Sequence, residues 1–182
     1  MEFVEPIRSR EKIAEIKNIL AKSGTRNLLL FVMGINTGLR ISDLITLKVK
    51  DVKERIHLEI VEIKTHKKKI FLINPTIGKI LFPYIENMAD DEFLFQSRKG
   101  ENTPITRVQA YRIINNATKK AGITDKIGTH TLRKTFGYHH YRDNKDVALL
   151  QKIFNHSSPS ITLRYIGISQ DEIDESYRNF SL

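Results

Sequence analysis

The sequence contains no cysteine, which excludes disulfides, cysteine nucleophiles and cysteine-ligated zinc. Any metal site would have to be built from histidine and carboxylate side chains. No apolar run is long enough to span a bilayer, and the first residues, MEFVEPIRSREK, lack the apolar stretch and the small-residue cleavage site of a signal peptide. We therefore expect a cytoplasmic protein with no membrane partner.

Internal repeats, low-complexity tracts and linkers rich in proline, glycine or serine are also lacking in the 182 residues. The length suffices for one hydrophobic core, and the composition, 40% hydrophobic and 28% charged, is that of a globular protein. We therefore expect residues 1–182 to form a single domain.

Positive charge is in excess, since 30 Lys and Arg against 21 Asp and Glu give a net charge of +9 and a sequence pI near 9.7. The cations are also segregated, because residues 107–142 contain eight Lys or Arg and a single acid, Asp125. A basic face of this kind is the electrostatic footprint of a nucleic-acid-binding protein. The charge pattern alone leaves open a solvated charged surface with no such partner.

Apolar residues recur at helical spacing through most of the chain, and capping residues mark the expected helix ends. Ser9, Ser42, Thr129 and Ser158 are placed as N-caps, and Gly38 as the left-handed residue that ends a helix. The predicted helices run from Ser9 to Lys22, Thr25 to Gly38, Asp43 to Leu47, Pro75 to Asn87, Arg107 to Gly122, Thr129 to Tyr141, Val147 to Phe154, Pro159 to Gly167 and Gln170 to Arg178. In the helix that starts at Arg107, the expected buried face is Val108, Tyr111, Ile114 and Ala117.

Between Ile56 and Ile73 the sequence becomes rich in β-branched and aromatic residues, in IHLEIVEIK and KKIFLI, which predicts a β-hairpin. The apolar phase shifts between Ile60 and Val61, which predicts either a bulge or a strand buried on both faces. The expected fold class is mainly α with a small antiparallel β-sheet, an α+β domain.

Four separated segments place a cation or a hydrogen-bond donor at a helix terminus or a hairpin tip. They are TGLRISD at residues 37–43, Lys64 in the hairpin, HTLR at residues 130–133, and HSSP at residues 156–159 running on to Tyr165. Taken with their order, these segments resemble the tyrosine site-specific recombinases of the phage integrase family. That family has an Arg in a TGLRxS(E/D)L box, a Lys in a KTG-like hairpin, an HxxR box, a second His after a helix, and a Tyr about nine residues later.

The resemblance extends from Thr25 to Gly167 and implies the fold of a recombinase catalytic domain. It also implies double-stranded DNA as the partner, a bacterial or phage-encoded source, and no cofactor, metal or small-molecule substrate. Family members commonly carry an N-terminal core-binding domain that closes a clamp around DNA. We expect these 182 residues to lack it.

Attack on a phosphodiester builds up negative charge, which a site without metal must meet with fixed positive donors. Arg40 and Arg133 can each present a bidentate fork to phosphate oxygens. His130 lies three residues before Arg133 and so shares its helix face. His156 lies just before a helix N-terminus, where anions are favoured.

The resemblance assigns the individual steps. Tyr165 is the nucleophile that forms a 3′-phosphotyrosyl bond, and His130 assists the loss of its proton. His156 donates a hydrogen bond to the scissile phosphate, and Lys64 is the general acid for the leaving 5′ oxygen. Because the phosphotyrosyl bond stores the energy of the phosphodiester, rejoining needs no ATP.

Further residues are candidates for supporting roles. Asp43, three residues after Arg40, is expected to orient that arginine through a carboxylate contact. The candidates for DNA contact are Lys67, Lys68, Lys69, Arg107, Arg112 and Lys134. The three lysines share the hairpin with Lys64, and an ordinary solvated charge run is the alternative explanation for them. His139 and His140 are not expected to bind metal, because adjacent helical residues diverge by about 100°.

The sequence departs from the family pattern at two turns. His66 stands at the hairpin tip where the family often has Gly, and Asn155 stands where Gly usually precedes the second His. Asn tolerates a left-handed backbone, so we expect the second turn to be retained.

Three other functions compete with recombination. A type IB topoisomerase would use the same catalytic set and relax supercoils without sequence preference. A DNA-binding regulator of recombination would keep the fold with weak or no catalysis. A histidine-based metal nuclease would be abolished by chelators.

Residues after Tyr165 are expected to form an exchange element. Ile173, Tyr177 and Phe180 make an apolar face at helical spacing, which predicts a helix that docks on another protomer, giving a homo-oligomer on DNA. The alternative is that this segment folds back on its own core.

Overall fold

The computed structural model describes residues 4–168 and 177–180. Within them, helices and one hairpin make up the regular structure, so the expected mainly α fold with a small antiparallel sheet is confirmed. The elements in order are α1 (Arg10–Ser23), α2 (Thr25–Thr37), α3 (Ile41–Leu44), α4 (Val49–Val52), β1 (His57–Val61), β2 (Lys68–Leu72), α5 (Pro75–Ile85), α6 (Arg107–Lys120), α7 (Thr131–Asn144), α8 (Val147–Phe154) and α9 (Pro159–Ile166).

Several helix ends lie where the capping residues predict them. Ser9 caps α1 by accepting a hydrogen bond from the backbone N of Lys12, and Ser158 caps α9 ahead of Pro159 in the same way. α2 ends at Gly38, whose φ of 64° is left-handed. A Cβ at this position would lie 2.5 Å from the Phe136 ring, so both the backbone and the close approach of α7 require glycine.

The helix that carries the TGLR segment begins earlier than predicted. α3 starts at Ile41, and its N-cap is Arg40 in extended conformation, so the prediction of Ser42 as the cap was wrong. The reason is that the carbonyl of Arg40 already accepts hydrogen bonds from the backbone N of Asp43 and Leu44. The Arg40 backbone is thereby fixed at the junction between α2 and α3.

The start of α7 also differs from the prediction. Its N-cap is His130, and Thr129 lies outside the helix. The hydroxyl of Thr131 accepts a hydrogen bond from the backbone N of Gly128, which tightens the turn before the helix. This turn places the His130 side chain at the N-terminus of α7.

The buried face of α6 was predicted in part. Ile114 and Ala117 are buried as expected, but Val108 is 57% exposed and Tyr111 is 37% exposed. The face that packs on the core is instead continued by Ala110, one helical turn before Ile114. The apolar side chains of Val108 and Tyr111 are left on the solvent side of the helix.

The hairpin is regular where a bulge or double burial was expected. β1 and β2 pair antiparallel without interruption, from His57 opposite Leu72 to Val61 opposite Lys68. Leu58 is fully buried and Ile60 packs against the core, whereas Val61 is 63% exposed. The phase shift in the sequence therefore reflects an apolar residue that points to solvent, and the earlier interpretation was wrong.

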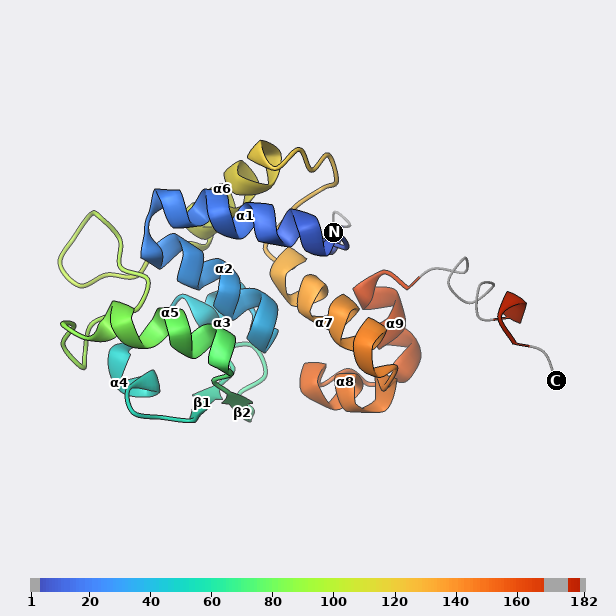
Figure 1. Cartoon of the computed structure of the whole chain (residues 1–182). Coiled ribbons are helices and arrows are strands. Elements are labelled where there is room, and N and C mark those ends of the chain that lie inside the picture. The colour runs from blue at the N-terminus through green and yellow to red at the C-terminus, as the bar shows by residue number, and fades with distance from the viewer. Residues whose placement is uncertain (1–3, 169–176, 181–182) are drawn as a thin grey trace.

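Two hydrophobic clusters meet at α7. The larger includes buried residues of α1, α2, α5 and α6, and the smaller consists of Leu150, Phe154 and Ile166 from α8 and α9. In Figure 1, α7 runs between these two parts, and the hairpin lies at the edge of the larger one. Gly137 of α7 permits the contact, since a Cβ there would lie 2.7 Å from Phe154 and 2.6 Å from Ile166.

The predicted helix from Gln170 to Arg178, with Ile173, falls largely outside the described residues. Of the apolar face expected there, Tyr177 is 77% exposed and Phe180 is 67% exposed. The docking of this segment on another protomer thus stays a prediction.

Candidate active site

Arg133 is the most deeply buried of the predicted site cations, with 3% of its surface exposed. Its Nη1 donates to the carbonyl of Gly38 at 2.6 Å, and its Nη2 donates to the carbonyl of Phe154 at 3.0 Å. The guanidinium also lies 4.4 Å from the centroid of the Phe154 ring. Arg133 therefore joins the end of α2 to the end of α8, at the border between the two clusters. Burial lowers its pKa, but an arginine side chain remains a cation at neutral pH.

Arg40 reaches the same place from the N-cap of α3. Its Nη1 lies 2.5 Å from Oε1 of Glu62, a residue that follows β1 and is fully buried. The same carboxylate oxygen lies 4.0 Å from Nη1 of Arg133. The two arginines predicted from separate segments are thus brought to one carboxylate.

The carboxylate contact predicted for Asp43 belongs to Glu62 instead. Asp43 is 3% exposed, and its Oδ1 accepts a hydrogen bond of 3.0 Å from the backbone N of Ile63. Burial raises the pKa of Asp43. Asp43 therefore anchors the chain just after β1, and it supports Arg40 indirectly by holding the segment that contains Glu62.

Tyr165 and His130 meet across the junction between α9 and α7. The Nδ1 of His130 lies 3.3 Å from the phenol oxygen of Tyr165, and the two rings stand edge to face, 6.3 Å apart between centroids. Tyr165 also packs on Phe154, beside Arg133. The tyrosine is in this way positioned by its own chain against the histidine that is expected to assist it.

His156 completes the group. Its ring centroid lies 5.1 Å from that of Tyr165, and its Nδ1 lies 3.0 Å from the hydroxyl of Thr162. The turn that delivers His156 depends on Asn155, whose φ of 56° ends α8 in the left-handed region. The expected retention of this turn is confirmed.

The protonation states of these groups follow from burial and from the arginines. Burial and the charge of Arg133 lower the pKa of His130, and the same causes lower the pKa of His156 to about 4. Both imidazoles are therefore neutral at pH 7. Burial raises the pKa of Tyr165, against the opposing effect of Arg133 and Arg40. The phenol is protonated in the free protein and must lose its proton during a reaction.

Lys64 lies in the turn between β1 and β2, and its side chain is exposed. Burial lowers the pKa of His130 together with the charges of Arg133, Arg40 and Lys134, and the charge of Lys64 adds to these effects. His66 follows in the same turn with a φ of 54°. The tip therefore has the left-handed backbone for which the family often uses Gly, although the residue here is histidine.

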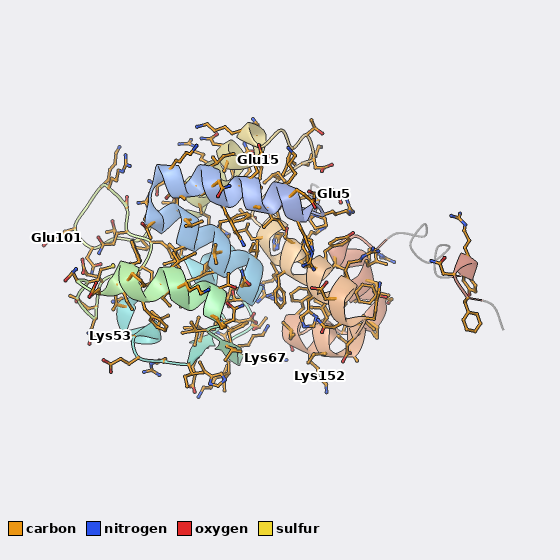
Figure 2. All side chains as sticks on the ribbon, in the orientation of Figure 1. Glu5, Glu15, Lys53, Lys67, Glu101 and Lys152 are labelled. Atoms are coloured by element: carbon orange, nitrogen blue, oxygen red, sulfur yellow. The ribbon has the colours of Figure 1, made fainter. Side chains whose placement is uncertain are left out.

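The other hairpin lysines are placed differently from one another. Lys67 donates to Oδ1 of Asn155 at 3.0 Å, and Figure 2 shows it between the hairpin and α8. Lys68 is exposed and pairs with Glu59 at 2.6 Å. Lys69 is not the surface cation that was expected, because its side chain is 12% exposed and its Nζ lies 3.0 Å from Oε1 of Glu62.

Lys134 is also buried, whereas the predicted contact with DNA would need an exposed side chain. It is 5% exposed, and its Nζ donates to the carbonyl of Val4 at 2.8 Å. In this conformation the side chain fastens the segment before α1 to α7. Arg107, at the first position of α6, is exposed as expected.

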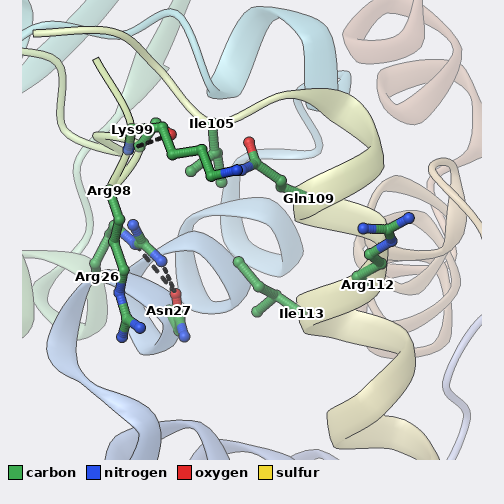
Figure 3. Close-up of a pocket in the computed structure, with 9 residues that line it drawn as sticks. Arg26, Asn27, Arg98, Lys99, Ile105, Gln109, Arg112 and Ile113 are labelled. Carbon is green, nitrogen blue, oxygen red and sulfur yellow. Dashed lines mark hydrogen bonds between the residues drawn. The ribbon is translucent and has the colours of Figure 1, made fainter. Parts of the chain in front are cut away.

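A second basic surface lies apart from these residues, around a hollow of about 410 Å³. Its lining includes four cations, Arg26, Arg98, Lys99 and Arg112, and no acid. Figure 3 shows Arg112 on α6, on the opposite side of the hollow from Arg26 and Arg98, with Lys99 extending toward Gln109. Only Arg112 was identified from the sequence. The other three come from α2 and from the loop before α6, which the charge count over residues 107–142 does not include.

Within residues 4–168 and 177–180, no group of three or more His, Asp or Glu is arranged so that it could hold a metal ion. No helix in that part of the chain is long and apolar enough to cross a membrane.

The sequence matches the phage integrase family over residues 9–172, a span that includes every predicted site residue. The chain belongs to the phage integrase family. It is also similar to a probable integrase/recombinase, YoeC, of Bacillus subtilis strain 168, with 49% identity over 99% of this chain and 98% of that protein. The family resemblance read from the sequence, and the expectation of an integrase or tyrosine recombinase, are confirmed.

More distant relatives are longer. The tyrosine recombinase XerH of Campylobacter jejuni is 30% identical over 94% of this chain, which spans 50% of the XerH length. The XerD recombinases of several bacteria are matched over 59% of their length.

Solved structures show the same fold. The crystal structure of the XerA recombinase superposes with a TM-score of 0.80 at 24% identity, covering 99% of this chain and 68% of that one. The catalytic domain of bacteriophage HP1 integrase superposes with a TM-score of 0.64 at 20% identity, covering 96% and 95%. The phage integrase fold expected for the catalytic domain is therefore confirmed.

Proposed function

We propose that this protein binds double-stranded DNA and breaks and rejoins it through Tyr165 during site-specific recombination or integration, without a metal ion. The observation that carries the proposal is the contact between His130 Nδ1 and the phenol oxygen of Tyr165 at 3.3 Å, beside two arginines from other segments. Family membership supports it, because the relatives are named integrases and tyrosine recombinases.

The first step is cleavage of one strand. The phenol oxygen of Tyr165 attacks the scissile phosphorus, a phosphotyrosyl bond forms to the 3′ side, and the bond to the 5′ oxygen breaks. The phenol proton passes to Nδ1 of His130, which can accept it because burial and Arg133 keep that imidazole neutral. This requires the His130 tautomer with its proton on Nε2.

The leaving 5′ oxygen takes a proton from Lys64, which the hairpin turn can bring to the site. Arg40 and Arg133 stabilise the additional negative charge on the non-bridging oxygens as the phosphorus becomes five-coordinate. His156, neutral and close to Tyr165, donates a hydrogen bond from Nε2 to one of the same oxygens, in the tautomer whose Nδ1 accepts from the Thr162 hydroxyl. The reverse sequence, with a 5′ hydroxyl of another strand as nucleophile, rejoins the DNA and frees Tyr165.

Contacts to the duplex outside the scissile phosphate fall to exposed cations. The hollow lined by Arg26, Arg98, Lys99 and Arg112 fits a backbone phosphate, since it carries four positive charges and no acid. XerH has been solved bound to its difH substrate, and a λ integrase dimer bound to a core site, with the same fold. On this basis we propose a homo-oligomer on DNA, held through the segment that includes Ile173, Tyr177 and Phe180.

The proposal is tested with a pool of duplexes of randomised sequence, each carrying a nick in the strand to be cleaved. After cleavage, the short fragment with the free 5′ hydroxyl can diffuse away, so the strand is not rejoined. Incubation in EDTA followed by SDS electrophoresis is expected to show a covalent protein–DNA adduct. The adduct is expected to disappear in Tyr165→Phe, with Tyr111→Phe, at a tyrosine exposed on α6, as the matched control. Absence of any adduct from the wild-type chain, or its persistence in Tyr165→Phe, would contradict the proposal.

A further inference from the structure

Glu62 is a fully buried carboxylate in the middle of the cationic site, and none of the steps above uses it. Its Oε1 lies 2.5 Å from Arg40 Nη1, 3.0 Å from Lys69 Nζ and 4.0 Å from Arg133 Nη1. Its Oε2 accepts a hydrogen bond of 2.6 Å from the hydroxyl of Thr65. One carboxylate thus contacts side chains from α3, β2 and the hairpin turn, and approaches the arginine of α7.

The carboxylate is charged. Burial by itself would raise the pKa of Glu62, but hydrogen bonds from Arg40, Thr65 and Lys69 outweigh it and lower the pKa to about 2. A buried ion is tolerated where several partners compensate its lost hydration, and this one has three. Glu62 is therefore a fixed negative charge at every pH at which the protein would work.

The hairpin builds this arrangement. Alternate residues of a strand share a face, so Leu58, Ile60 and Glu62 point inward in turn. Lys69 enters from β2, and its Nζ also donates to the carbonyl of Ile153 at 2.6 Å. The hairpin is thereby fastened to α8, the helix that leads to His156.

Arg40 depends on Glu62 for its position. Among the residues that the structure describes, Glu62 is the ion-pair partner of the Arg40 guanidinium and holds it through Nη1. That pair occupies Nη1 and leaves Nε and Nη2 for other acceptors. Arg133, in contrast, is held by two backbone carbonyls and needs no carboxylate to stay in place.

We propose that Glu62 is a positioning residue for strand cleavage, which holds the Arg40 guanidinium and the Lys69 ammonium beside Arg133 before DNA arrives. This inference rests on the proposed function. The scissile phosphate then meets a preorganised fork and does not have to order a mobile arginine during the reaction. Glu62 also separates three positive charges that would otherwise repel one another at short range.

If Glu62 inhibited the site, removing it would have the opposite effect on cleavage. If the carboxylate blocked the site by competing with phosphate for Arg40, its removal would strengthen DNA binding and accelerate cleavage. A positioning residue, when removed, slows cleavage and leaves DNA binding nearly unchanged, because most of the affinity for DNA comes from contacts elsewhere on the duplex.

The decisive variant is Glu62→Gln, which keeps the shape and removes the charge. Its matched control is Glu59→Gln, which removes an exposed carboxylate of the same strand that pairs with Lys68. With the nicked duplexes described above, Glu62→Gln is expected to form the adduct about 10- to 100-fold more slowly in single turnover, with a Kd for DNA within about 3-fold of wild type. Glu59→Gln is expected to match the wild-type rate.

A double variant separates positioning from general stability. If Glu62 acts through Arg40, then Arg40→Ala combined with Glu62→Gln cleaves no more slowly than Arg40→Ala alone. Effects that multiply would show that Glu62 acts on cleavage by another route, and would overturn the inference.

Thr65→Val covers the case in which Glu62→Gln does not fold. It removes the hydrogen bond to Oε2 and leaves the charge, so adduct formation is expected to slow by about 2- to 5-fold, in line with the loss of one of the contacts that hold the carboxylate. Thermal unfolding of each variant reports whether it is folded.

Three further results would overturn the inference. One is a Glu62→Gln variant that cleaves as fast as wild type or faster, and another is a Thr65→Val variant with an unchanged rate in the absence of folded Glu62→Gln. The third is a wild-type chain that forms no adduct, which removes the proposed function as well. An active wild type with an unaffected Glu62→Gln removes this inference alone.

Discussion

His130 and Tyr165 are 35 positions apart in the chain, yet Nδ1 of the histidine lies 3.3 Å from the phenol oxygen of the tyrosine. The contact is made within one chain, because α9 packs against α7 through the cluster of Leu150, Phe154 and Ile166. It requires an imidazole that is neutral at pH 7 and a phenol that still carries its proton. Burial supplies both conditions by lowering the pKa of the first and raising that of the second.

The neutral state of His156 can be measured in the free protein. Burial together with Arg133 and Arg40 lowers its pKa to about 4, so the group binds a proton in the unfolded chain near pH 6.5 and in the folded chain only at much lower pH. In NMR titration of the folded protein, the ring signals of His156 are expected to stay constant from pH 8 to about pH 5.5. In urea the same signals should titrate near 6.5, and a folded-state midpoint at or above that value would contradict the assignment.

Lys64 and Lys69 can be distinguished by the leaving group. A duplex in which sulfur replaces the bridging 5′ oxygen needs no general acid, because a thiolate leaves without a proton. Lys64→Ala is expected to cleave the ordinary duplex about 10²- to 10³-fold more slowly than wild type and the sulfur duplex at nearly the wild-type rate.

Lys69→Ala is the comparison, since Lys69 holds Glu62 and the carbonyl of Ile153. Its defect is expected to be the same with both duplexes. A defect of Lys64→Ala that sulfur does not rescue, with rescue in Lys69→Ala, would exchange the roles of the two lysines.

The basic hollow predicts how DNA binding depends on salt concentration. If Arg112 contacts a backbone phosphate, Arg112→Gln should weaken DNA binding and reduce the slope of log K against log salt concentration by about 0.9. Arg98→Gln is expected to do the same from the opposite side of the hollow. Lys53→Gln, which removes an exposed lysine paired with Asp90, is the control and should leave the slope unchanged. An unchanged slope in both arginine variants would place the duplex elsewhere.

Local signals in the sequence were sufficient for much of the fold. Ser9, Ser158 and Gly38 act where their short-range chemistry predicts, because a cap or a left-handed turn depends on a few neighbouring atoms. The boundaries of α3 and α7 could not be read in this way. There, backbone hydrogen bonds of Arg40 and Gly128 decide between capping candidates that lie one or two positions apart.

The candidate site was predictable where residue types are chemically distinctive, and the structure brings Arg40, His130, Arg133, His156 and Tyr165 together. Glu62 was missed, and the contact it makes was assigned to Asp43. In the sequence, Glu62 looks like one more charged residue in a hairpin rich in Lys and Glu, whose ordinary state is solvated. The available signal was its phase, since it occupies the inward position after Leu58 and Ile60.

Mass spectrometry of the covalent adduct tests the central claim most directly. After trapping on the nicked duplexes and digestion with nuclease and protease, the peptide that contains Tyr165 is expected to carry one nucleotide on its phenol oxygen. The mass should be that of a phosphodiester to the 3′ position. A nucleotide attached to any other residue, or cleaved DNA with no nucleotide on the protein, would contradict the account.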